Sequence, residues 1–291
     1  MALESSYIKF NWARELIDLF ESDVKRHLGD ENYQAVMEPQ VFMSNGNSRV
    51  PIILKIIQEA PVDIFSVRAG DIVHNLRSAL NHAIFEISLN HSTGIAIKNQ
   101  RSLQFPICDS EEDFERDLKR GVIENHPKEA IEYIRSLQPF SNSEGTLSEL
   151  RQISNADKHR TIQMTLISLP YITRTIITYS GGWGPNLFER LLIKCLGPKF
   201  VSGTRTRSKT IPLDLPENPE GDKLVPLENG SSLGGMLFGG EYDRNLPTMA
   251  FDLHLKLVFE QGPLQNKEVV PFLKNCSTEV EGILDSLKSF A

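Results

Sequence analysis

The chain has 291 residues, of which 40% are hydrophobic and 24% are charged, and its formal net charge is −7. This length allows one large core or two smaller ones, and no apolar run approaches the roughly 18 residues that cross a membrane. The acidic total argues against a protein that coats DNA or RNA through phosphate contacts, because such proteins are usually basic.

The N-terminus and the cysteines both point to the cytoplasm. The stretch MALESSYIKFNWARELI has no basic segment followed by an apolar core, so it does not resemble a secretory signal. Cys108, Cys195 and Cys276 are widely spaced and form no CxxC pair, so they predict neither a disulfide framework nor a zinc knuckle. We interpret all three as small, buried or half-buried residues.

The first 90 residues predict two helices with a hairpin between them. Residues 11–28 carry apolar side chains at helical spacing. Residues 33–58 are rich in Val, Ile and Phe around Asn45-Gly46, a pair that suits a tight turn, so we expect a β-hairpin there. A long helix follows over 61–90.

The remaining chain passes from short helices to strands. After the extended piece LQFPI, helices are expected over 110–118, 128–137 and 146–157. A closing helix is expected in the last residues, over 267–291. The expected strands before it lie in TIQMTLISL, YITRTIITY, SKTIPLDL and MAFDLHLKLVFEQ.

Together these elements predict an α+β protein. We expect a mainly helical part over 1–160 that includes the hairpin, followed by an antiparallel β-rich part over 161–291 capped by the C-terminal helix. Because no long polar linker separates the two parts, we expect them to pack as one body.

Familiar nucleotide and metal motifs are absent from the sequence. It contains no GxxxxGK[ST], GxGxxG, HExxH or GxSxG, and its glycine clusters fit turns between strands. We therefore expect neither a cofactor nor a metal ion.

The helix over 66–90 has two contrasting faces. At about 100° per residue, its apolar side chains fall in a stripe about 140° wide, which predicts a core-facing surface. The stripe consists of Ile72, Val73, Leu76, Ala79, Leu80, Ala83, Ile84 and Ile87. The opposite face consists of His74, Arg77, Ser78, Asn81, His82 and Phe85.

This polar face is unusual for a helix surface. His74, Ser78 and His82 form a ladder at i, i+4 and i+8, and Arg77 and Asn81 form a second pair beside it. An ordinary solvated face is the first interpretation, yet such faces favour Lys, Glu and Gln, which this stretch lacks. We therefore expect the face to be partly buried, either hydrogen-bonded across an interface or lining a pocket.

A metal site is a further interpretation of the same histidines. His74 and His82 lie about 12 Å apart along the helix axis, so they cannot bind one ion together. His82, His159 and Asp157 form a ligand set that folding could assemble.

Two resemblances rest on these motifs. The segment from Arg77 to His82 is an R-x4-H pattern on a helix, which resembles the motif of the HEPN superfamily, helical proteins that include many metal-independent ribonucleases of toxin–antitoxin and phage-defence systems. The strings GDIVHNLRSALNH, LQFPI, SLQPF and SNADKHR also resemble a group of bacterial proteins that have no assigned function.

The HEPN resemblance implies a mechanism in which an RNA 2′-hydroxyl attacks the adjacent phosphate. His82 would act as general base or acid, because histidine titrates near neutral pH, and Arg77 would hold the phosphate. Asn81 and Ser78 would orient these groups, and His74 is a further candidate on the same ladder. The site typically forms between two subunits in that superfamily, which implies a homodimer.

A second polar cluster ends the helix over 146–157. Cations at a helix C-terminus interact favourably with the helix dipole, and Asp157 can pair locally, so a structural interpretation is natural. In the functional interpretation, Asp157, Lys158, His159 and Arg160 meet the long helix and extend a phosphate-binding groove.

Three hypotheses follow. The first is a cytoplasmic bacterial α+β protein whose HEPN-like part is a ribonuclease of a defence or toxin system. The alternative is a non-enzymatic binding or scaffold protein, in which the polar face is a buried hydrogen-bond network between the helical and β-rich parts. The second alternative is a metal-dependent hydrolase.

Overall fold

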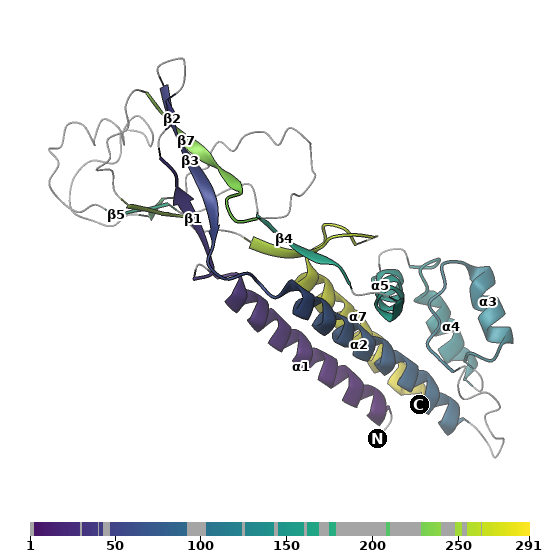
Figure 1. Ribbon diagram of the computed structural model, residues 1–291. Helices are drawn as coiled ribbons and strands as arrows, with labels where there is room; N and C mark the ends of the chain where they lie inside the picture. Colours follow the sequence, from purple (N-terminus) through teal and green to yellow (C-terminus); the bar gives the residue numbers. More distant parts are fainter. Residues whose placement is uncertain are drawn as a thin grey trace. The chain divides into compact units, whose positions relative to one another are not determined.

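We analysed a computed structural model of the chain (Figure 1). The residues that the structure describes are 3–29, 31–39, 41–42, 47–91, 103–123, 126–142, 145–159, 162–168, 175–178, 208–209, 228–239, 248–251, 255–262 and 264–291.

The predicted α+β class is confirmed, and the chain divides into two units. The helical unit contains Met1–His27, Ala60–Leu166 and Leu257–Ala291, and the β-rich unit contains Leu28–Glu59 and Ile167–Lys256.

Three long helices form the centre of the helical unit: α1 (Glu4–His27), α2 (Val62–Asn90) and α7 (Val269–Leu287). They run side by side in Figure 1, and each packs against the other two. Each member of the predicted apolar stripe on α2 is at most 1% exposed, so the prediction of a core-facing surface is confirmed. Burying one such Ile or Leu side chain stabilises the fold by about 1.5–3 kcal/mol.

Three shorter helices lie in the same unit. They are α3 (Glu111–Lys119), α4 (Lys128–Ser136) and α5 (Leu147–His159), close to their predicted bounds. The side chain of Ser110 accepts a hydrogen bond from the backbone N–H of Asp113 at 3.2 Å, so Ser110 caps α3 as its position predicts.

The predicted hairpin is present in the β-rich unit. Strands β1 (Tyr33–Met37) and β2 (Val41–Phe42) pair in turn with β3 (Asn47–Ile56) in antiparallel fashion. The predicted turn residues Asn45 and Gly46 lie outside the described residues.

Pro51 explains why two short strands, rather than one, line this edge of β3. The register changes by one residue between β1 and β2, and within this break the carbonyl oxygen of Pro51 accepts from the N–H of Glu38 at 2.9 Å. In an extended chain the N and C=O of one residue point to the same side. An N–H at Pro51 would point to the same side as its carbonyl, toward this break. Because proline has no N–H, the ladder lacks that hydrogen bond at the point where β1 ends.

The other strands are short. The opposite edge of β3 pairs with β7 (Ser232–Gly239), and β5 (Thr175–Thr178) pairs with both β6 (Ser208–Lys209) and β8 (Thr248–Phe251). A separate pair consists of β4 (Met164–Ser168) and β9 (Leu255–Phe259).

The segment MAFDLHLKLVFEQ differs from its prediction as one alternating strand. It contributes both β8 and β9, and the consecutive residues Leu257, Val258 and Phe259 are all buried. Such a run is typical of a strand covered on both faces, whereas alternation predicts only one covered face.

The two units also differ from the predicted division at residue 160. The C-terminal helix α7 belongs to the helical unit, because its apolar face packs on α1 and α2, and its Phe272 also contacts Phe259 of β9 edge to face. The hairpin belongs to the β-rich unit, because β3 pairs with β7 far along the chain. That the units form one body stays a prediction.

No helix within the described part of the chain is long and apolar enough to cross a membrane.

Candidate functional site

The polar face of α2 binds residues 103–109, a segment of irregular chain that is buried except at Gln104 and Asp109. The guanidinium Nη2 of Arg77 donates to the carbonyl oxygen of Phe105 at 2.5 Å, and the side-chain oxygen of Asn81 accepts from the N–H of Phe105 at 3.0 Å. One turn of α2 therefore satisfies both backbone groups of a residue that is 0% exposed.

Gln138 binds the same segment. This residue lies just beyond Leu137, the C-cap of α4, and is fully buried. Its amide nitrogen donates to the carbonyl of Pro106 at 3.1 Å, and its oxygen accepts from the N–H of Cys108 at 2.9 Å. A second bond from the amide nitrogen, to the carbonyl of Ile134 at 2.9 Å, fixes the side chain to its own helix.

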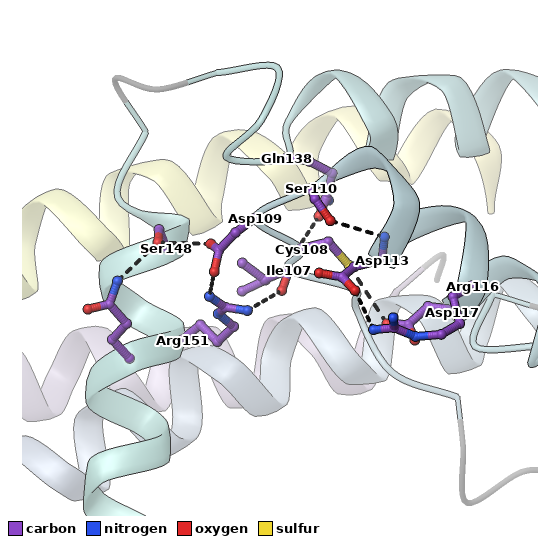
Figure 2. A network of polar contacts seen from close by, with 11 residues as sticks. Ile107, Cys108, Asp109, Ser110, Asp113, Arg116, Asp117, Gln138, Ser148 and Arg151 are labelled. Atoms are coloured by element: carbon purple, nitrogen blue, oxygen red, sulfur yellow. Dashed lines mark hydrogen bonds and ion pairs between the residues drawn. The ribbon is translucent and has the colours of Figure 1, made fainter.

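Arg151 of α5 completes the set, as Figure 2 shows. Its Nη1 donates to the carbonyl of Ile107 at 3.2 Å, and its Nη2 forms an ion pair with Asp109. Asp109 also accepts from Ser148 at 3.4 Å, so its carboxylate is bound from two positions on α5.

These contacts replace a β-ladder with side chains. In an extended chain, successive residues direct their N–H and C=O groups to alternate sides. Phe105 and Ile107 bond to Arg77, Asn81 and Arg151, whereas the groups of Pro106 and Cys108 bond to Gln138. From Phe105 to Cys108 the segment thus behaves as a strand whose neighbours are side chains, whereas the N–H of Gln104 donates to the backbone carbonyl of Val122 at 3.3 Å.

Cys108 and Cys276 are buried free thiols, which confirms the prediction for these two cysteines. Burial, together with the neighbouring carboxylate of Asp117, raises the pKa of the Cys108 thiol to about 11. Burial also raises the pKa of Cys276 to about 12. Both thiols stay protonated at neutral pH and are poor nucleophiles. Cys195 lies outside the described residues.

Arg77 is in an unfavourable environment for a cation. Burial, and then the positive charge of Arg151, lower the pKa of the Arg77 guanidinium to about 10. Within the described residues, no carboxylate lies within ion-pair distance of Arg77, and its Nη1 is buried without a hydrogen-bond partner.

His82 belongs to a different network, on the side of α2 that faces α1. Its Nδ1 lies 2.8 Å from the hydroxyl oxygen of Ser5, and this hydroxyl also contacts the Glu86 carboxylate one turn further along α2. The backbone N–H of Ser6 donates to the same carboxylate oxygen at 3.2 Å.

Counting hydrogens assigns the roles in this chain. The Ser5 hydroxyl has one proton, and an ionised Glu86 can only accept, so the hydroxyl donates to Glu86. Its oxygen must then accept from Nδ1–H of His82. This assignment holds the imidazole in one orientation and leaves the Nε2 lone pair of the neutral ring available.

A lysine lies along the same α1–α2 seam. Lys9 is one turn beyond Ser5 on α1, and its Nζ lies 3.4 Å from the side-chain oxygen of Asn75. The bond is at the long end of the range, so the ammonium group is only loosely held.

The remaining candidates on α2 lie apart from both networks. His74 is exposed, and Ser78 is half-buried without a hydrogen bond to any residue that the structure describes. Asp157 of α5 packs against Gly70, so closely that a Cβ there would overlap its carboxylate. Burial, and then the charge of Asp71, raise the pKa of Asp157, and His74 partly opposes the shift.

The structure does not bring the predicted metal ligands together. Asp157 meets α2 at Gly70, and His82 is twelve residues further on, which is about 18 Å along the axis. No group of three His, Cys, Asp or Glu side chains suited to a metal occurs among the described residues. The prediction that His82 and Asp157 bind one metal ion together is therefore wrong.

The side chains of Lys158 and His159, and all of Arg160, lie outside the described residues. Their phosphate-binding role stays a prediction.

Sequence reasoning missed several residues of both networks. Ser5, Glu86 and Arg151 follow ordinary helical patterns, so nothing local distinguishes them. Gln138 had a signal, because it lies within SLQPF, one of the strings that carry the second resemblance.

Comparison with known proteins gave no relative: no family model, curated protein or solved structure matches the chain.

We predict that Asn81→Ala lowers the free energy of unfolding by about 1–3 kcal/mol, because the buried N–H of Phe105 loses its acceptor. Urea denaturation measures the change. Ser78→Ala is the matched control on the same face, and we expect it to cost less than about 0.5 kcal/mol. Equal stability of the two variants would contradict the role of Asn81.

Proposed function

We propose that the helical unit is a metal-independent endoribonuclease of the HEPN-like kind, acting in the cytoplasm in a defence or toxin system. The observation that carries the proposal is the chain from Glu86 through Ser5 to His82. In this chain Ser5 and Glu86 orient the imidazole of His82, as a second group commonly orients an acid–base histidine, and the Nε2 atom remains for the substrate.

In the proposed reaction, the Nε2 atom of His82 acts first as the general base and then as the general acid. The 2′-hydroxyl proton moves to Nε2 while the 2′-oxygen bonds to phosphorus. The bond from phosphorus to the 5′-oxygen then breaks, and the leaving oxygen takes a proton from the imidazolium. The products are a 2′,3′-cyclic phosphate and a 5′-hydroxyl.

Lys9 is the residue that we assign to the phosphate. The HEPN resemblance gives this role to Arg77, but the Nη2 of Arg77 is bonded to Phe105 and its Nη1 is buried. Lys9 is on the seam of His82 and is loosely bound, so its ammonium group can turn to a phosphate at low cost.

We also propose that the protein is a homodimer. Ile8, Trp12 and Leu19 are 64%, 49% and 60% exposed, and helical geometry places them within about 40° of one another on α1. An exposed apolar stripe of this kind is typical of an interaction surface. Ser5 lies beside it on the same helix, so a second copy would cover the region next to His82.

A second candidate function is a non-enzymatic binding or scaffold protein. The bonds from Arg77 and Asn81 to Phe105 support it, because they are structural contacts that occupy two of the six residues of the polar face. The network lies within the helical unit, whereas the sequence placed it between the helical and β-rich parts.

We predict that His82→Ala loses cleavage of total bacterial RNA by about 10²–10⁴-fold, because general acid–base catalysis contributes this much. The assay contains EDTA and scores cyclic-phosphate ends. His91→Ala is the control: it removes a histidine at the end of the same helix, bonded to the carbonyl of Phe290.

Three outcomes separate the candidates. Cleavage by wild type and His91→Ala, but not by a folded His82→Ala, supports the ribonuclease. Absence of cleavage by wild type contradicts it and leaves the scaffold. Cleavage that EDTA abolishes contradicts metal independence.

We predict that Trp12→Glu/Leu19→Glu shifts the protein from dimer to monomer, because a charge in an apolar interface is costly to desolvate. Sedimentation velocity measures the mass. Ile57→Glu, at an equally exposed residue of the other unit, should leave the dimer intact. A wild-type protein that sediments as a monomer would refute the dimer.

A further inference from the structure

Two arginines bind the same edge of segment 103–109. Arg77 donates to the carbonyl of Phe105, and Arg151 donates to the carbonyl of Ile107. Carbonyls two residues apart in an extended chain point to the same side and lie about 7 Å from each other. The two guanidinium groups are therefore neighbours along one edge, which agrees with the effect of Arg151 on the pKa of Arg77.

Each guanidinium has one buried nitrogen that lacks an acceptor. Arg77 Nη1 and Arg151 Nε are buried and have no hydrogen-bond partner within the described part of the chain. A buried N–H without an acceptor costs about 1–3 kcal/mol, and more when it carries charge. Native proteins rarely leave such a group unpaired, and two on adjacent side chains call for a common acceptor.

The charges are unbalanced in the same place. Among the described residues, Asp109 is the one carboxylate that forms an ion pair with either arginine, and it pairs with Arg151. Arg77 thus contributes a buried positive charge without a counterion. By contrast, Arg135 of α4 forms ion pairs with Glu111 and Glu115.

We infer that one small inorganic anion, of the size of chloride, is bound between Arg77 Nη1 and Arg151 Nε and is the counterion of Arg77. Two donor nitrogens match a monovalent sphere, whereas the four oxygens of a phosphate would need more donors than these two nitrogens carry. A water molecule would accept both hydrogen bonds but would leave the charge uncompensated. The site requires neither RNA nor His82, so it extends beyond the proposed function.

Bromide is the direct probe, because it replaces chloride and scatters X-rays anomalously. Crystals of the full chain grown in sodium bromide should show an anomalous peak within hydrogen-bonding distance of Arg77 Nη1 and Arg151 Nε. Absence of a peak there overturns the inference, and a water molecule in its place does the same.

Thermal stability gives an independent test. At constant ionic strength, replacing gluconate with chloride should raise the wild-type melting temperature by about 2–4 °C at ten times the dissociation constant. Arg77→Met should lose this response, and Arg135→Met should keep it. A response that survives in Arg77→Met, or that is absent in wild type, overturns the inference. If Arg77→Met does not fold, the bromide result decides.

Discussion

The helical unit depends on how the peptide groups of residues 103–109 find hydrogen-bond partners away from water. The segment carries buried apolar side chains, including Phe105 and Ile107, so it cannot move to the surface without losing core contacts. It belongs to no helix or sheet, so its backbone groups have no regular partner. Arg77, Asn81, Gln138 and Arg151 supply those partners.

This constraint explains the composition of the polar face of α2. The buried carbonyl of Phe105 needs a donor, which Arg77 supplies, and its buried N–H needs an acceptor, which Asn81 supplies. Lys alone can only donate, and ionised Glu alone can only accept. On one side of the face, Arg77 and Asn81 bind the backbone of Phe105. On the side that faces α1, Ser5 and Glu86 orient His82. The R-x4-H pattern therefore spans two separate networks within one chain.

Local patterns predicted much of the fold but not its long-range pairings. The apolar stripe from Ile72 to Ile87 follows from helical periodicity, and the absence of Lys, Glu and Gln from the opposite face correctly indicated partial burial of Arg77 and Asn81. That segment 103–109 binds this face could not be predicted, because LQFPI resembles any short extended segment. The pairing of β3 with β7 and the packing of α7 on α1 join residues far apart in sequence. Likewise, nothing near His82 indicates Ser5, which is 77 positions away.

Amide hydrogen exchange of Phe105 and Cys108 shows whether side chains bind the backbone of segment 103–109. Both amides should be strongly protected although they lie outside helices and sheets, because Asn81 and Gln138 accept from them. In Asn81→Ala, protection should fall at Phe105 and persist at Cys108. Exchange of both amides in wild type at the rate of an open loop would mean that Asn81 and Gln138 do not hold the segment in place.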